Sequence, residues 1–472
     1  MFFKQIVHED LGCASYLVCS TETSECAVID PRWEIEPYLE VAAKHGFRIS
    51  HIVETHNHAD HVSGHGRLVE ATGAQIDVHE DAGVDYAHHS LKDGEVISIG
   101  DVKLHVIHTP GHRPEHIALA VEDTSRGNDP WMVLTGDSLF VGDVARPDLA
   151  VDGQEGAEAL YHSLHDKLLQ LPEYTEVYPA HVSGSLCGRV TSTVNSTTLG
   201  YEKRFNGALR LEDEREFVSY MNENLPVRPP NMENIVEQNR GPLVTENPPL
   251  ETLTPHAVQD AVQEGAVVLD VRPSDTYLKE HILGSVHVSL SGAQFGTRVG
   301  FVLPPETRLI VVAEDSEEIQ RATDSLRVVA FDALAGSVDM EAWKAAGRET
   351  VGTARVAPRD LQHRLERGDN VRVLDVREPS EWEEGHVAGA AFIPYRELPK
   401  RMGEVPGGAP LAVTCGSSSR SPVAVSLLER AGFSHLINVD EGMGGWNRAG
   451  LPTTQDAQRA GNENVKERAS VS

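Results

Sequence analysis

The sequence predicts a multidomain α/β protein, in which one layered α/β domain precedes two copies of a smaller α/β domain with a parallel sheet. The chain has 472 residues, too many for one ordinary hydrophobic core, so roughly two to four domains are expected. Its first part alternates strand-like runs with helical stretches, which is typical of a layered α/β domain. Its second part contains an internal repeat.

In the first part, strand-like runs end in polar residues and are separated by helical stretches such as GRLVEATGA at 66–74. The runs are AVID at 27–30, HIVET at 51–55, VKLHVIHT at 102–109, WMVLTGD at 131–137 and EVYPAH at 176–181. We expect this domain to span 1–240. Proline and polar residues then dominate between Asn224 and Pro255, which predicts an extended linker or arm, with the linker proper at 241–254.

The internal repeat relates segment 265–286 to segment 370–391 at a fixed shift. The matched residues are Asp270, Arg272, His281 and Gly284 in the first copy and Asp375, Arg377, His386 and Gly389 in the second. A period of about one hundred residues indicates a duplicated domain and not a solenoid. Strands and helices alternate in each copy, so each should form a small parallel sheet flanked by helices. We expect the copies at 255–350 and 355–455, and a disordered tail at 456–472.

Charge and composition limit the classes of partner. The formal net charge is −31, and neither nucleic acid nor an anionic membrane would be attracted by such a chain. An anionic substrate would therefore need a metal, an arginine or backbone amides to hold it. No long apolar run predicts a membrane span, and the start of the chain is a poor signal peptide.

The 5 cysteines form no CxxC pair, which predicts reduced thiols and a cytoplasmic protein. We expect the cysteines at 13, 19 and 26 to be core residues.

Histidines and aspartates gather at the ends of the predicted strands of the first part. The segment HIVETHNHADHVSG, which begins at His51, holds four of them on one loop, and three more follow later strands. The seven candidates are His56, His58, Asp60, His61, His112, Asp137 and His181. Side chains at neighbouring strand ends can converge on one rim of a sheet, so these residues predict a metal site.

These motifs resemble those of the metallo-β-lactamase superfamily, over roughly residues 1–240. The resemblance implies an αββα sandwich with the metal between two sheets. It leaves two reactions open. In a glyoxalase II-like thioester hydrolase, all seven side chains would bind two metals. In a persulfide dioxygenase, one Fe(II) per chain would be held by His56, His112 and Asp137, and the other four would support them. Two imidazoles and one carboxylate leave coordination positions for O₂ and a sulfur ligand.

Two further stretches resemble bacterial persulfide dioxygenases that are fused to sulfurtransferases, namely 137–149 and 181–204. The second stretch contains Cys187, which either exchanges persulfide near the iron or is a small buried apolar residue. A C-terminal helical segment with basic residues, as glyoxalase II proteins use for glutathione, has no clear counterpart in this chain. The dioxygenase is therefore the favoured reading.

The second repeat copy has a strand that ends at Cys415, followed by the loop GSSSR and a helical run. Backbone N–H groups of such a loop and the helix dipole favour a thiolate and an anionic persulfide. This copy resembles the rhodanese sulfurtransferases, and both copies together cover about 252–455. The resemblance implies that Cys415 carries sulfur, that Arg420 binds sulfite or thiosulfate, and that Gly416, Ser417, Ser418 and Ser419 line the loop. Many relatives have glycine where this chain has Ser418.

The first repeat copy lacks this chemistry, because Ala313 stands where Cys415 does and Glu318 stands where Arg420 does. We expect it to be catalytically inactive. Together the resemblances imply oxidation of a low-molecular-weight thiol persulfide by O₂ to sulfite, coupled to sulfur transfer through Cys415, from persulfide to sulfite or in reverse. The alternatives are the two-metal thioester hydrolase with an attached sulfurtransferase and a non-catalytic sulfide-sensing scaffold. Relatives with this architecture often self-associate, so a homo-oligomer fits the resemblance.

Overall fold

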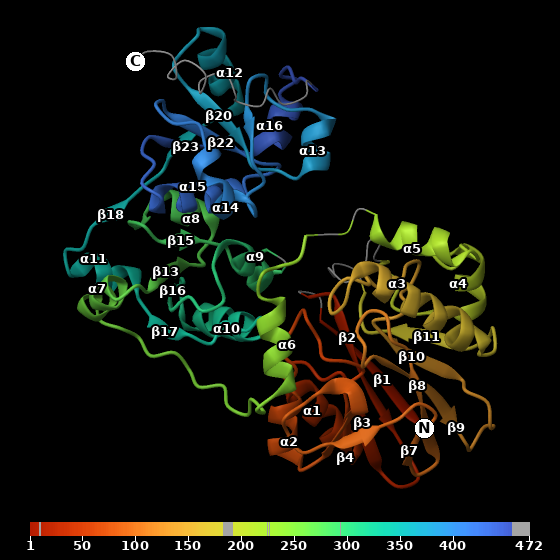
Figure 1. Ribbon diagram of the computed structural model, residues 1–472. Coiled ribbons are helices and arrows are strands. Elements are labelled where there is room, and N and C mark those ends of the chain that lie inside the picture. Colours follow the sequence, from red (N-terminus) through yellow and green to blue (C-terminus); the bar gives the residue numbers. More distant parts are fainter. Residues whose placement is uncertain (9–10, 183–191, 224, 226, 293, 456–472) are drawn as a thin grey trace, which may run out of the picture. The chain divides into compact units, whose positions relative to one another are not determined.

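The computed structural model describes residues 1–8, 11–182, 192–223, 225, 227–292 and 294–455 (Figure 1). It divides into two compact units, residues 1–248 with 324–332 and residues 249–323 with 333–472. No helix among the described residues has both the length and the apolar character that a membrane span requires. The α/β class predicted from the sequence is confirmed, and each unit is described below by itself.

Unit 1 contains two six-stranded sheets. The first has the order β1-β2-β3-β4-β5-β6, and its strands are β1 (Phe2–His8), β2 (Cys13–Cys19), β3 (Glu25–Ile29), β4 (Arg48–Val53), β5 (Gln75–His79) and β6 (His89–Leu91). The second has the order β12-β11-β10-β9-β8-β7, and its strands are β7 (Val96–Ile99), β8 (Val102–His108), β9 (Ile117–Asp123), β10 (Met132–Gly136), β11 (Glu176–Pro179) and β12 (Thr197–Thr198). The strand-like runs predicted from the sequence correspond to β3, β4, β8, β10 and β11.

Packing of the side chains arranges unit 1 in four layers. Strand β2 sends Ala14, Tyr16 and Val18 into a core that it shares with strands of the second sheet, whereas Leu17 and Cys19 face helices on the other side. This alternation follows from the two-residue period of a strand. The helices against the first sheet are α1 (Glu36–His45) and α2 (His65–Thr72). Those against the second include α3 (Gly153–His162), α4 (Leu199–Phe205) and α5 (Glu214–Asn222). The expected αββα sandwich is confirmed.

Two local expectations are wrong. Cys19 and Cys26 form a disulfide, because they are directly opposite each other on the antiparallel strands β2 and β3, with Cα atoms 4.0 Å apart. They belong to the core as expected, but they are not reduced thiols. Helix α6 (Met232–Arg240) lies within the segment expected to be extended, and it buries Met232, Ile235 and Val236. The structure describes all residues from Gly241 to Thr254, and none of them lies in a helix or strand.

Unit 2 contains two parallel sheets, one in each repeat copy, as expected. The first has the order β15-β13-β16-β17, from β13 (Val267–Asp270), β15 (Val286–His287), β16 (Leu309–Val312) and β17 (Leu334–Ser337). The second has the order β19-β23-β22-β20-β21, from β19 (Ala354–Val356), β20 (Arg372–Asp375), β21 (Ala391–Phe392), β22 (Leu411–Thr414) and β23 (Leu436–Val439). Unit 2 also contains a short antiparallel pair, formed by β14 (His281–Ile282) and β18 (Thr350–Val351).

Helices flank both of these sheets. Those of the first copy are α7 (Pro255–Gln263), α8 (Ser274–Lys279), α9 (Phe295–Val302), α10 (Ser316–Arg327) and α11 (Met340–Ala345). Those of the second are α12 (Pro358–Glu366), α13 (Pro379–Glu384), α14 (Leu398–Arg401), α15 (Ser421–Arg430) and α16 (Gly442–Arg448). The expected tail, 456–472, lies outside the described residues.

Candidate functional site

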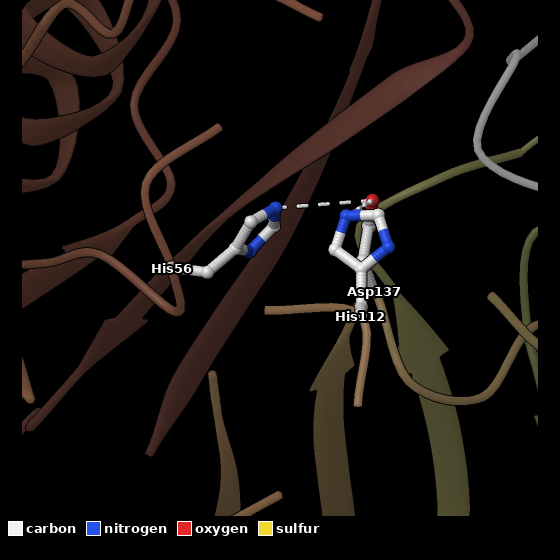
Figure 2. Close-up of side chains that lie close together, drawn as sticks. All are labelled: His56, His112 and Asp137. Atoms are coloured by element: carbon white, nitrogen blue, oxygen red, sulfur yellow. Dashed lines mark ion pairs between the residues drawn. The ribbon is translucent and has the colours of Figure 1, made fainter. Parts of the chain in front are cut away.

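The candidate metal ligands come from the ends of strands in both sheets of unit 1. His56 follows β4 of the first sheet, whereas His112 follows β8 and Asp137 directly follows β10 of the second. Figure 2 shows the ring of His56 pointing toward the carboxylate of Asp137, with the ring of His112 beside it. The sandwich therefore brings together three residues that are far apart in the sequence.

The ligand atoms of His56, His112 and Asp137 lie within 4.8 Å of one another. His112 Nε2 is 3.4 Å and His56 Nε2 is 3.8 Å from Asp137 Oδ2, and none of the three side chains is more than 1% exposed. These three atoms are buried and have no hydrogen-bond partner. A buried polar atom without a hydrogen-bond partner costs about 1–3 kcal/mol. The convergence of three such atoms indicates that they share one ligand, and two imidazoles with one carboxylate fit a metal ion.

Hydrogen bonds on the far side of each ring fix the tautomer that a metal requires. His112 Nδ1 donates to the carbonyl oxygen of Arg146 at 3.1 Å, because a carbonyl can only accept. Thr55 Oγ1 donates to Asp30 and can therefore accept from His56 Nδ1, 2.9 Å away. In both rings the lone pair is left on Nε2, the atom that faces the centre of the triad.

The electrostatic surroundings favour the protonation states of metal ligands. Burial lowers the pKa of His56 well below its usual value, and neighbouring imidazoles lower it further. Burial also lowers the pKa of His112. Burial alone would raise the pKa of Asp137, but His181 and His112 outweigh this effect and lower it to about 2. Neutral imidazoles and an ionised carboxylate are the forms that bind a metal.

The remaining candidates form a second group beside the triad. His181 lies between two carboxylates, with Nδ1 2.6 Å from Asp137 Oδ1 and Nε2 2.7 Å from Asp60 Oδ2. Asp60 also accepts from His61 Nδ1 at 3.1 Å. The ligand atoms of His58, Asp60 and His61 lie within 4.8 Å of one another. Both ring nitrogens of His181 thus face acceptors.

The Nε2 atom of His58 faces two buried acids that the sequence analysis missed. This atom is 3.3 Å from Asp30 Oδ1 and 3.3 Å from Glu54 Oε2. Burial alone would lower the pKa of His58, but the two carboxylates outweigh it and raise the pKa well above its usual value. The signal in the sequence was that both acids stand at the ends of strand-like runs, directly before polar loops.

His116 is a further residue that the sequence analysis missed. Its Nε2 accepts the backbone N–H of Asp137 at 2.8 Å and its Nδ1 lies 2.8 Å from Thr109 Oγ1. Burial lowers the pKa of His116 to about 3, which keeps it neutral and able to accept. The backbone at Gly136 has φ +51°, and a Cβ there would lie 2.5 Å from His116 Nε2. This close approach orients the loop that carries Asp137. The signal in the sequence was that His116 stands four residues after His112.

The candidate thiol of unit 2 lies where the sequence predicts it. Cys415 directly follows β22, is fully buried, and has its Sγ 3.5 Å from Ser421 Oγ at the start of α15. Ser418 has φ +62°, a conformation that favours glycine, and its hydroxyl donates to the carbonyl oxygen of Val439 at 3.0 Å. The other candidate thiol, Cys187, lies outside the described residues.

Arg420 ends the loop, but it is paired with an acid. Its Nη1 and Nη2 donate to the two carboxylate oxygens of Glu381 at 2.6 and 2.8 Å. In the first copy the corresponding loop has no thiol, and the carboxylate of Glu318 accepts the backbone N–H of Glu314 at 3.0 Å. In the first copy, a carboxylate of the protein itself thus binds a backbone N–H group of the loop.

Comparisons with known proteins agree with this architecture. The model of the metallo-beta-lactamase superfamily matches residues 8–181, and that of the rhodanese-like domain matches 254–346 and 357–449. The chain is 34% identical over 233 residues to the mitochondrial persulfide dioxygenase ETHE1 of Homo sapiens, which covers 46% of this chain and 80% of that protein. It is 31% identical over 240 residues to a hydroxyacylglutathione hydrolase of Polaromonas sp., which covers 46% of this chain and 87% of that protein.

A solved structure extends the likeness beyond the first domain. The crystal structure of a metallo-β-lactamase from Staphylococcus aureus subsp. aureus COL matches with a TM-score of 0.64 and 28% identity, and it covers 72% of this chain and 99% of that chain. The fold and these relatives imply that the first domain binds a metal, and the triad supplies suitable donors. The chain belongs to the metallo-β-lactamase superfamily, and two tandem rhodanese-like domains follow its metallo-β-lactamase domain.

Proposed function

We propose that the metallo-β-lactamase domain oxidises a low-molecular-weight thiol persulfide to sulfite at a single Fe(II), and that Cys415 couples this oxidation to sulfur transfer. The overall oxidation consumes one persulfide, one O₂ and one water, and it releases the free thiol, sulfite and two protons. The charge of the chain, −31, argues that anionic substrates are held by local groups.

The observation that carries the proposal is the division of the seven candidate ligands into two groups. The free ligand atoms of His56, His112 and Asp137 converge, whereas the two ring nitrogens of His181 already face Asp137 and Asp60. A second metal that used His181 as a ligand would have to displace these contacts. The arrangement therefore supports one metal with two imidazoles and one carboxylate, a donor set that suits Fe(II) and leaves room for exogenous ligands.

In this function, His56, His112 and Asp137 would hold the Fe(II), which supplies the redox centre for persulfide and O₂. Thr55 and the Arg146 carbonyl keep the two rings oriented, and His116 holds the Asp137 loop. His181 and Asp60 form a route for the protons that the oxidation releases. His181 Nε2 is 2.7 Å from Asp60, whose side chain is 13% exposed and can pass a proton to solvent.

The product of the first reaction is a substrate for the second. Cys415, carrying an extra sulfur as a persulfide, gives that sulfur to sulfite. A sulfur–sulfur bond to sulfite forms, the one to Cys415 breaks, and thiosulfate and the Cys415 thiolate result. Because one chain carries both sites, the effective concentration of each site near the other is higher than it would be in two separate proteins. The first rhodanese-like copy has no thiol and takes no part in this transfer.

Iron analysis and oxygen uptake on one purified sample test the proposal. We expect about one iron per chain, as in a mononuclear site, and O₂ consumption when glutathione persulfide is added. Thiosulfate should appear when sulfite and a persulfide donor are supplied together. Two zinc ions per chain and no oxygen uptake would contradict the proposal.

The alternative is a two-metal hydrolase of glutathione thioesters. It is favoured by the group of His58, Asp60 and His61, whose ligand atoms also lie within 4.8 Å of one another. A hydrolase gains from a second cation that activates the bound water. Cleavage of a glutathione thioester in anaerobic buffer, at a rate that rises with a second equivalent of zinc, would favour this alternative.

A further inference from the structure

The environment of Arg420 differs from that expected of an anion-binding arginine. Its guanidinium makes a bidentate pair with Glu381, whose carboxylate cancels its charge. Both side chains lie over the loop residue next to Cys415. A Cβ at Gly416 would be 2.9 Å from Arg420 Nη2 and 3.2 Å from Glu381 Oε1. A neutral ion pair, and not a free cation, thus stands at the loop where a sulfur oxyanion would bind.

The duplication supplies an internal comparison for this ion pair. Arg272 in the first copy and Arg377 in the second bind Asp270 and Asp375 alike, with Nη2 to Oδ2 distances of 2.6 and 2.8 Å. That pair is present with and without a thiol, so it supports the fold.

The Glu381–Arg420 pair, in contrast, has no equivalent in the first copy. Thr276 stands in the first copy where Glu381 does, and Glu318 stands where Arg420 does. Both members are absent from the copy that lacks the cysteine. The pair therefore occurs only in the copy that has the thiol of Cys415, unlike the Asp–Arg pair that both copies share.

Glu381 also makes a structural contact, and the effect of this contact must be separated from the effect of the charge. Its Oε2 accepts the backbone N–H of Glu378 at 3.1 Å and so caps helix α13. A glutamine can make the same contact, because its amide oxygen accepts as a carboxylate does. Glu381→Gln therefore removes the charge and keeps the cap.

We propose that Glu381 determines substrate specificity at Cys415: by neutralising Arg420 it weakens the binding of doubly charged sulfur oxyanions and so favours the release of thiosulfate. This inference rests on the proposed sulfur transfer through Cys415. The persulfide of Cys415 is itself negative, so an arriving dianion meets a net negative loop. Without the Glu381 charge, the same loop would be neutral. The side chains of Arg420 and Glu381 are 22% and 32% exposed, so solvent screens the effect only in part.

The reverse reaction measures this effect directly. The Cys415 thiolate attacks the outer sulfur of thiosulfate, a Cys415 persulfide forms and sulfite leaves. Cyanide then removes the outer sulfur as thiocyanate and regenerates the thiolate. In the full chain, we expect Glu381→Gln to lower KM for thiosulfate on the order of fivefold, with kcat changed less than about twofold. Alkylation of Cys415 by neutral iodoacetamide should become faster, because an unpaired Arg420 stabilises the thiolate.

Three further variants separate charge from structure. Glu404→Gln removes a carboxylate that pairs with Arg401 at 2.7 Å in the same domain, and it should leave KM unchanged. Glu381→Asp keeps the charge and should resemble the wild type. In an Arg420→Gln background, Glu381→Gln should have no further effect on KM, since it acts through the arginine.

The outcomes distinguish this inference from the proposed function. If the wild type transfers no sulfur from thiosulfate and Cys415 resists alkylation, the proposed transfer through Cys415 is wrong. If the wild type is active but Glu381→Gln leaves both KM and the alkylation rate unchanged, or raises KM, the role of Glu381 is wrong. A fall in stability without a lower KM also contradicts it, because that result would show a structural role only.

Discussion

Each imidazole of the candidate metal triad owes its orientation to a residue that would not touch the metal. His112 is held by a backbone carbonyl, and His56 is held by a hydroxyl that is itself bound to Asp30. The row of hydrogen bonds from Asp30 through Thr55 to His56 is buried. Such contacts fix the tautomer and reduce the freedom of the ring, so they contribute to metal affinity.

The contact between Thr55 and His56 gives a prediction at this scale. Thr55→Val keeps the shape of the side chain and removes the acceptor for His56 Nδ1, so we expect metal affinity to fall about 10- to 100-fold. Isothermal titration of the metal-depleted chain with Fe(II) under nitrogen would measure it. The matched control is Thr175→Val, since Thr175 is equally buried and its hydroxyl has no hydrogen-bond partner. Equal affinities in the two variants would refute the role of Thr55.

The convergence of the candidate ligands could be predicted from the sequence, whereas the residues that orient them could not. His56, His112 and Asp137 each follow a strand-like run, and strand ends converge in any layered sheet. The roles of Arg146 and His116 depend on which atom of a ring faces which neighbour. The carbonyl of Arg146 carries no sequence information at all, because every residue has one. The disulfide partners, Cys19 and Cys26, could likewise be paired only once the register of β2 and β3 was known.

At the scale of the element, a loop between a strand and a helix positions the thiol of the second rhodanese-like copy. Strand β22 ends one residue before Cys415, and α15 begins one residue after Arg420. The loop also packs closely on the start of α16, where a Cβ on Gly442 would lie 2.1 Å from the carbonyl oxygen of Cys415. Ser418 holds the left-handed turn of the loop with its bond to Val439.

Two substitutions at Ser418 separate its backbone strain from its hydrogen bond. Ser418→Ala loses the bond to Val439 and keeps the strained φ, so it should destabilise the domain by about 1 kcal/mol. Ser418→Gly loses the same bond but relieves the strain, worth about 1 kcal/mol, so it should remain close to the wild type. Thermal unfolding would rank the three chains. An alanine variant more stable than the glycine variant would show that the turn is not strained.

Five strands of unit 1 could be predicted from the hydrophobic pattern of the sequence, whereas helix α6 could not. The runs that became β3, β4, β8, β10 and β11 were visible as strands. The sequence analysis did not predict helix α6, because prolines flank this short amphipathic segment on both sides. Its buried residues, Met232, Ile235, Val236 and Asn239, nevertheless have the spacing of one helical face.

At the scale of the whole molecule, the chain combines a candidate metal site and a candidate thiol site that use different residues. The triad belongs to unit 1, and Cys415 with its loop belongs to unit 2. Domain order and duplication could be predicted from the sequence, because the repeat pairs Asp270 with Asp375 and Arg272 with Arg377. The ligand residues alone could not decide the reaction, since the same seven side chains fit either two metals with seven ligands or one metal with three.

The proposed coupling predicts that each site works without the other. Cys415→Ser should keep oxygen uptake with glutathione persulfide and lose thiosulfate formation, because it removes the sulfur carrier and leaves the triad intact. His112→Ala should lose metal and oxygen uptake but still transfer sulfur from thiosulfate to cyanide. His88→Ala, which removes an exposed histidine from unit 1, should change neither activity. An oxygen electrode and a thiocyanate assay on the same preparations give both readouts. If Cys415→Ser also abolished oxygen uptake, the two reactions would share a site, and transfer of free sulfite between them would have to be abandoned.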